Sequence, residues 1–290
     1  MLDIDDLNIF VEVADAGGLT SAARRLGLSK SVVSRRLARL ESELSVQLVS
    51  RTTRGITLTE AGATFRDHAA RIGIELELAR ETMLPTGALR GRLRIAAPVS
   101  FGATHLVPLL AELAEQHPLI HIQTSFSDHF VNVVGEGFDA AIRIGHLADS
   151  NLVARRIGPI FSKLVASPAY IRAHGEPRAP DDIVNHEAVS QVAETWRFVE
   201  NGKVITIHPR GRFNANDGQA LVAAALAGMG ITLLPDFLTD THIASGALVP
   251  IMQQFPVPEL GMYLVRPPGA HPPRKVRVLI EMLVERFGNP

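Results

Sequence analysis

Apolar residues near the start of the chain recur with helical spacing. Across residues 29–44 they lie four, three and four positions apart, so they form one apolar stripe on a helix. These residues are Val33, Leu37, Leu40 and Leu44. A shorter helix is predicted over residues 20–26, Gly27-Leu28 suits the turn between the two, and Ser29 suits the N-cap of the second. Two helices joined by a short turn containing glycine form the helix-turn-helix pattern.

The face opposite that stripe combines short hydroxyls with long cations and carries no acid. It consists of Lys30, Ser31, Ser34, Arg35 and Ala38. Such a face suits a DNA major groove, because cations hold phosphates or guanine edges and serine makes short hydrogen bonds. A helix with one basic face is more often an ordinary surface helix. Charge favours DNA: residues 20–54 hold eight cations and two acids, a charge of +6 in a chain of net charge −1.

Two short strands are predicted after this helix. Residues 48–51 and 55–58 flank a polar turn, which indicates a β-hairpin. As a wing beside the recognition helix, it would bring Arg51 and Arg54 to phosphates or a minor groove. The alternative is a generic basic turn. Residues 2–16 predict a first helix that packs behind the helix-turn-helix and to which we assign no chemistry.

A long helix is predicted over residues 60–83, and Pro85 and Gly87 end it in a hinge. Apolar residues along it are spaced four, three, four, three and four apart, which is an a/d heptad seam. They are Phe65, Ala69, Ile72, Leu76, Ala79 and Met83. The narrow seam favours pairing with a second copy, since a helix-turn-helix commonly reads two half-sites. The alternative is a domain helix lying on one neighbour.

The stretch Leu26-x-Leu28-Ser29-x-Ser31-x-Val33-Ser34-Arg35-x-Leu37-x-x-Leu40-Glu41 closely resembles the winged helix-turn-helix of LysR-type transcriptional regulators. The match begins at Leu19-Thr20-x-Ala22-Ala23 and continues through Leu48-x-x-Arg51-x-Thr53-Arg54-x-Ile56-x-Leu58-Thr59-x-Ala61-Gly62. The resemblance implies a DNA-binding regulator that dimerises through the long helix and senses a ligand with its C-terminal half. The expected DNA-binding residues are Thr20, Ser29, Lys30, Ser31, Ser34, Arg35, Arg39, Arg51 and Arg54.

From residue 91 onward, strand patterns alternate with helical ones. Strands are predicted at 93–97, 120–126, 140–144, 161–166, 204–207, 211–214, 230–234 and 262–265, and helices at 101–116, 131–136, 168–173, 219–227 and 274–287. The alternation indicates a mostly parallel sheet covered by helices. The resemblance implies the two α/β lobes of type 2 periplasmic binding proteins, with chain crossings near 162–163 and 266–267.

The predicted organisation is therefore an all-α winged helix-turn-helix (residues 1–59), a linker helix (60–86) and a regulatory domain (87–290). Lobe I would span about 91–162 and 267–290, and lobe II about 163–266. In such folds ligands bind between the lobes, at the carboxyl ends of strands and the starts of helices.

Ser100 follows the first strand of this half and is expected to cap the next helix, where exposed N–H groups would favour an anion. Capping alone would also explain a serine there. The resemblance implies contact with a carboxylate effector. The expected effector-binding residues are Ser100, Phe101, Arg143, Gly145, His146, Asn216 and Asp217. The last two also fit an Asx-rich turn, and His146 an ordinary surface position. Trp196, the one tryptophan, suits either the pocket wall or the core.

No catalytic motif, metal-ligand spacing or nucleotide-binding loop is present in the sequence, and cysteine is absent, so we expect no enzyme activity, no metal and no cofactor. No apolar run is long enough to span a membrane and no export leader is evident, which predicts a cytoplasmic protein. The expected partners are double-stranded operator DNA, a small anionic effector and further copies of the chain as a homodimer or homotetramer. A regulator of this kind could also contact RNA polymerase.

Two rival functions remain open from the sequence. One is a small-molecule binding or transport protein with an incidental helical domain, which would leave the +6 cluster unexplained. The other is an enzyme fused to a helix-turn-helix, which would need a convergent acid/base pair between the lobes.

Overall fold

A computed structural model describes residues 2–52, 55–83, 88–129, 131–147, 149–269 and 271–288. The N-terminal domain contains α1 (Ile4–Ala16), α2 (Leu19–Leu26) and α3 (Lys30–Leu44), followed by the antiparallel hairpin of β1 (Val49–Thr52) and β2 (Gly55–Leu58). Ser29 caps α3 by accepting a hydrogen bond from the N–H of Val32 at 3.3 Å. This confirms the helix-turn-helix, the hairpin and the cap.

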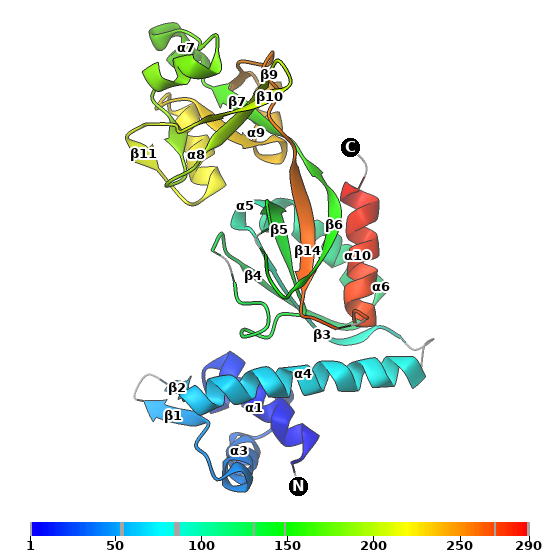
Figure 1. The fold of residues 1–290 in the computed structure, drawn as a ribbon. Coiled ribbons are helices and arrows are strands. Elements are labelled where there is room, and N and C mark those ends of the chain that lie inside the picture. The colour runs from blue at the N-terminus through cyan, green and yellow to red at the C-terminus, as the bar shows by residue number, and fades with distance from the viewer. Residues whose placement is uncertain are drawn as a thin grey trace.

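The predicted apolar stripe of α3 faces the core of this domain. Val33, Leu37 and Leu40 are each at most 1% exposed. The long helix α4 (Glu60–Met83) starts close against the hairpin. Its Gly62 lies against the backbone of Leu48, and a Cβ atom at this position would come within 1.9 Å of the Leu48 carbonyl oxygen. Figure 1 shows α4 lying between the N-terminal domain and the α/β half of the molecule.

Lobe I is built on a five-stranded mixed sheet with the order β4-β3-β5-β14-β6. Its strands are β3 (Arg90–Ala97), β4 (Leu119–Phe126), β5 (Ala140–Gly145), β6 (Val153–Ile160) and β14 (Leu260–Arg266). β3 runs parallel to β4 and β5, whereas β14 is antiparallel to β5 and β6. The segment α5 (Val99–Phe101), η1 (Gly102–Leu106) and α6 (Val107–Gln116) packs with α10 (Arg274–Phe287) to form the lobe's apolar core.

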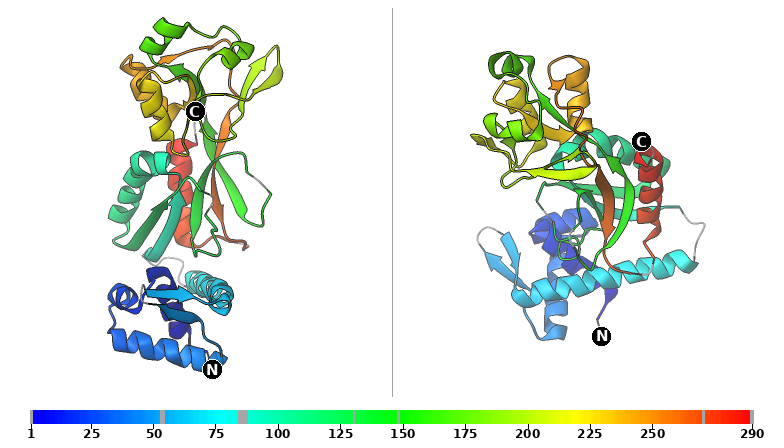
Figure 2. Two further views of the ribbon diagram at one scale, coloured as in Figure 1. Left: turned by 90° about the vertical axis from the view of Figure 1, so that its left-hand side faces the viewer. Right: turned by 45° about the horizontal axis from the view of Figure 1, so that its top comes forward.

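Lobe II surrounds a three-stranded antiparallel sheet with the order β12-β7-β13. Its elements are β7 (Ser162–Ala166), α7 (Pro168–His174), η2 (Pro180–Asn185), β8 (Val189–Ser190), β9 (Trp196–Glu200), β10 (Lys203–Ile207), β11 (Phe213–Asn214), α8 (Gly218–Leu226), β12 (Thr232–Pro235), α9 (Asp236–Ala244) and β13 (Val249–Pro250). The left view of Figure 2 shows lobe I between lobe II and the N-terminal domain, with α3 across the far end.

Several expectations for this half need correction. The sheets are not mostly parallel, because the sheet of lobe I is mixed and that of lobe II is antiparallel. The strand β9 was not predicted. The predicted helix over 131–136 is a series of turns. The strand β6 was not predicted, because its first half is exposed on both faces and has no apolar alternation. The return crossing lies before Leu260 rather than near 266–267, since β14 already belongs to the sheet of lobe I. The first crossing lies at Phe161, between β6 and β7, one residue from the expected position.

The N-terminal domain meets lobe I through a cluster of ion pairs. Asp15 of α1, whose side chain is 1% exposed, accepts hydrogen bonds from Arg66 of α4 at 2.5 and 3.2 Å. The same carboxylate binds Arg92 of β3 at 3.3 Å and also binds Arg94. Glu12, one turn earlier on α1, binds Arg92 as well. We call this group of five residues the junction cluster.

Candidate functional site

The outer face of α3 presents polar and basic side chains to solvent. Lys30, Ser31 and Arg35 are exposed, and among the described residues no ion pair reaches either cation. Ser34 is half-buried. Ser29 and Ser31 hydrogen-bond each other through their hydroxyls at 2.9 Å. Thr20 is exposed near the start of α2.

Arg39 lies on α3 but is held by α1. Its guanidinium binds the buried carboxylate of Asp6 at 2.6 Å and that of Asp3 at 3.0 Å. The hydrogen bond that Arg39 donates to Asp6 is the largest cause that raises the pKa of Arg39. Arg36 likewise binds Asp6, at 3.4 Å. Arg39 therefore contributes to the packing of α3 on α1, a role that the sequence pattern did not predict.

The expected wing is the hairpin of β1 and β2. Arg51 lies on β1, and its backbone pairs with Ile56 of β2. Arg54 lies outside the described residues. Their contacts with DNA stay a prediction.

The expected dimerisation seam divides into two parts along α4. Phe65 packs on Phe10 of α1 with ring centroids 5.6 Å apart, and Ala69 is 2% exposed in the same core. Ile72 is 44% exposed and Ala79 is exposed, while Leu76 is half-buried beside lobe I. The side chain of Met83 lies outside the described residues. The first turns of the seam thus contribute to the chain's own core, and pairing through the remainder stays a prediction.

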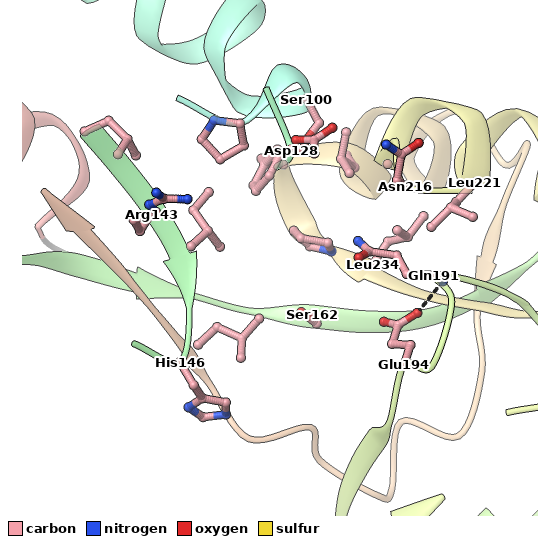
Figure 3. A pocket seen from close by; sticks show the side chains of 18 of the residues that line it. Ser100, Asp128, Arg143, His146, Ser162, Gln191, Glu194, Asn216, Leu221 and Leu234 are labelled. Atoms are coloured by element: carbon pink, nitrogen blue, oxygen red, sulfur yellow. Dashed lines mark hydrogen bonds between the residues drawn. The ribbon is translucent and has the colours of Figure 1, made fainter. Parts of the chain in front are cut away.

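A cavity of about 470 Å³ lies between the two lobes. It is lined by four of the expected effector residues, Ser100, Arg143, His146 and Asn216. Figure 3 shows their side chains around this space. The carboxyl end of β3 leads into it, because Ala96, Ala97 and Pro98 line the cavity just before Ser100. This volume is in the range typical of small-molecule sites.

The other three expected residues do not line the cavity. Phe101 is 1% exposed in the core of lobe I, where its ring meets that of Phe237 edge-on at 5.5 Å. Gly145 ends β5, with a φ of 122° that favours glycine. Asp217 is the N-cap of α8 and accepts a hydrogen bond from the N–H of Gln219 at 2.8 Å.

Ser100 does not cap its helix as expected. The N-cap is Pro98, and the carboxylate of Asp128 accepts a hydrogen bond from the N–H of Val99 at 3.0 Å. A carboxylate of the protein itself therefore occupies the position where we had expected an anionic ligand. Ser100 instead lies beside Gly218 of lobe II, whose Cβ position would be 3.6 Å from the serine Oγ.

Several cavity residues were missed by the sequence analysis. Asp128 and His129 follow the carboxyl end of β4, a location that could have indicated them. Glu194 lies in the loop before β9, and Arg197 follows on β9. Arg197 donates a hydrogen bond to Nε2 of His146 across the two lobes at 3.1 Å. No local pattern indicates these lobe II residues, because their place depends on how the lobes meet.

Burial shifts the pKa of several cavity groups. Desolvation is the main cause that raises the pKa of Glu194 and of Asp128, and Asp217 raises that of Asp128 further by repulsion. Desolvation also lowers the pKa of Arg143, which donates a hydrogen bond to the carbonyl of Val131 at 3.0 Å. Each shift disfavours a charged form, so these groups gain from a ligand of opposite charge.

Neither metal nor membrane features emerge from the part of the chain that is described. No group of three or more His, Asp or Glu side chains there could hold a metal ion. No described helix has the length and apolar character to cross a membrane.

Comparisons with known proteins agree with this architecture. Residues 4–63 match the family described as bacterial regulatory helix-turn-helix protein, lysR family, and residues 86–288 match the LysR substrate binding domain. The chain is 36% identical to an HTH-type transcriptional regulator of Xanthomonas campestris pv. campestris, over 98% of this chain and 86% of that protein. It is 35% identical to the HTH-type transcriptional regulator PtxR of Pseudomonas aeruginosa, over 99% and 94%.

A solved structure shares the whole arrangement. The LysR-type transcriptional regulator CrgA from Neisseria meningitidis is 31% identical, covers all of both chains and superposes with a TM-score of 0.63. Both domains of this chain and its full length therefore match one family. The protein belongs to the LysR-type transcriptional regulators, with an N-terminal DNA-binding helix-turn-helix domain and a C-terminal substrate-binding domain.

Proposed function

We propose that this protein binds a palindrome-like operator as a homodimer or homotetramer in the cytoplasm, and that a small effector bearing an anionic group binds between its lobes. α3 enters the major groove with Lys30, Ser31, Ser34 and Arg35, and the wing lies beside it. The observation that carries the proposal is that one chain combines an exposed basic face on α3 with an inter-lobe cavity of about 470 Å³. A binding protein would need only the second, and an enzyme only a cavity with catalytic groups.

The effector acts by favouring one arrangement of the lobes. Arg197 and His146 join the lobes across the cavity, and Ser100 lies against Gly218. A ligand that binds both lobes would favour one distance between the lobes over another. Only its difference in affinity between the two arrangements can change the protein's DNA binding.

The test of DNA binding is a gel shift with the purified full-length protein and the DNA upstream of its own gene. Phosphate contacts release counterions, so the affinity should fall steeply as salt rises. The complex should also survive an excess of unrelated DNA. A second assay with overlapping genomic fragments covers a remote operator, and failure of both would contradict the proposal.

Ser100→Ala tests the effector site separately. We expect this variant to keep its operator affinity, because Ser100 is remote from α3, and to lose the response to a ligand found by thermal-shift screening. A matched control is Ser245→Ala in lobe II, outside the residues that line the cavity. Loss of operator binding by Ser100→Ala would mean that this serine supports the fold rather than the ligand.

A further inference from the structure

Three carboxylates around the cavity lack a cationic partner. Asp128 faces it from lobe I and Glu194 from lobe II, and Asp217 lies close enough to repel Asp128. Each accepts a hydrogen bond from a backbone N–H, at 3.0 Å, 2.8 Å and 2.8 Å respectively. Among the described residues no ion pair reaches any of the three. A partly desolvated carboxylate without a cation is costly, so this arrangement needs a reason.

The loop before β9 holds Glu194 in place at a cost in backbone strain. Ala193 adopts a φ of 56°, in the left-handed region that residues with a Cβ rarely occupy. Gln191 and Glu194 close the turn through two hydrogen bonds, one from each backbone N–H. Figure 3 shows the bond between the Glu194 carboxylate and Gln191 at the edge of the cavity. Strain of this kind is typical of functional sites.

The same cavity carries positive charge on other elements. Arg143 extends from β5 of lobe I, and Arg197 from β9 of lobe II. Arg143 donates a hydrogen bond to the carbonyl of Val131, and its planar guanidinium has the geometry that suits a carboxylate. The lining therefore holds two arginines and two acids. A ligand with no net charge that carries one positive and one negative group would be complementary to both pairs.

We propose that the effector is a zwitterion of the amino-acid class. Its carboxylate binds Arg143 and Ser100, and its ammonium binds Glu194 and Asp128. This inference rests on the proposed function and narrows its ligand class. A purely anionic ligand would meet the two acids of the lining, and Asp128 and Asp217 already supply carboxylates at the starts of α5 and α8. A diamine would place one ammonium against Arg143.

The test uses full-length protein and three ligand series: the standard L-amino acids with short ω-amino acids, the dicarboxylates from malonate to adipate, and the corresponding diamines. Binding is measured by thermal shift and by the emission of Trp196, the one tryptophan, which is buried two residues from Glu194. The best amino acid is then compared with its N-acetyl derivative, which lacks the ammonium, and with its amide, which lacks the carboxylate.

We expect an amino acid to bind more tightly than any dicarboxylate or diamine, and each derivative to bind about 30-fold less tightly, since one buried charge loses its partner. The Glu194→Gln variant should bind the amino acid itself less tightly. N-acetylation of the ligand should then lower its affinity by a smaller factor than in the unaltered protein. The matched control is Glu200→Gln on β9, outside the cavity lining, which should behave as the unaltered protein. This double comparison assigns the ammonium to Glu194.

Other outcomes would overturn the zwitterion. Tight binding of a dicarboxylate that Arg143→Gln abolishes and Glu194→Gln strengthens would leave a plain anion as the effector, and the proposed function would stand. If no amino acid binds at millimolar concentration, the ligand class is wrong. Operator binding in the gel shift is independent of these results, so a failure there would count against the proposed function alone.

Discussion

The two ends of strand β3 lie at two sites that differ in whether their acidic side chains form ion pairs. At its start, Arg92 and Arg94 meet Asp15 and Glu12 of the DNA-binding domain, and each buried acid is shared by two or more arginines. At its end, the strand leads into the cavity, where Asp128 and Glu194 form no ion pair with any described residue. Only a few residues of one strand separate the two environments.

The charges of the junction cluster stabilise the fold, whereas the cavity acids are placed to bind a ligand. The junction cluster is complete within the chain, and removing Asp15 would leave Arg66 and Arg94 buried without their counter-charge. The cavity acids cost free energy in the ligand-free protein, and a ligand would repay it. The same distinction divides α3, where Arg36 and Arg39 are paired with α1 whereas Lys30 and Arg35 are not.

The largest expected effect is at Asp15. Asp15→Asn should lower the free energy of unfolding by about 3–5 kcal/mol, because Arg66 and Arg94 would keep their burial and lose their counter-charge. Urea unfolding followed by circular dichroism measures this change. The control is Asp5→Asn, whose 71% exposed side chain pairs with Arg36 at 3.4 Å and should contribute about 0–1 kcal/mol. Equal effects of the two variants would mean that the buried ion pairs of the junction cluster stabilise the fold no more than an exposed pair does.

A second prediction compares two arginines of α3. Arg35→Ala should weaken operator binding by about 1–3 kcal/mol and leave the thermal midpoint unchanged, because its side chain is exposed and unpaired in the described chain. Arg39→Ala should lower the midpoint, since Asp6 is 2% exposed and loses its nearer partner. Gel shifts and thermal melts on both proteins provide the two measurements. If Arg39→Ala weakens binding and leaves the midpoint unchanged, Arg39 contacts DNA after all.

The sequence could predict what depends on local spacing. The stripe of α3, the Ser29 cap and α10 follow from residues within a few turns of one another, and α10 begins and ends where the pattern indicated. Arg39 could not be placed in this way, because the acids that hold it lie more than thirty positions earlier on another helix. Its charge alone could not distinguish a phosphate contact from an ion pair.

The inter-lobe cavity shows the same limit. Ser100, Arg143, His146 and Asn216 could be predicted because they follow strands or precede helices, as ligand-binding residues in such folds do. Glu194 and Arg197 reach the cavity through a strained turn and a hairpin that no periodicity indicates. Asp128 was not predicted because Ser100, being adjacent in sequence, was the expected cap of the same helix. In the structure Asp128, which follows β4, accepts the hydrogen bond at the start of that helix instead.

The smallest expected effect is a gain in stability at the cavity. Burial raises the pKa of Glu194 in the folded state, so its ionised form destabilises the ligand-free protein. The folded state then binds more protons than the unfolded state between the two pKa values, and stability falls as pH rises through that range. Glu194→Gln should therefore stabilise the protein by about 0.5–2 kcal/mol at neutral pH. The gain should vanish below about pH 4, where the unfolded carboxyl is protonated too.

Thermal melts across this pH range, with Glu200→Gln as the control, measure the gain. A variant that loses ligand affinity while gaining stability would identify Glu194 as a charge kept for binding. A variant that loses stability at neutral pH would instead place Glu194 with the junction acids, as part of the framework, and the contrast between the two ends of β3 would not hold.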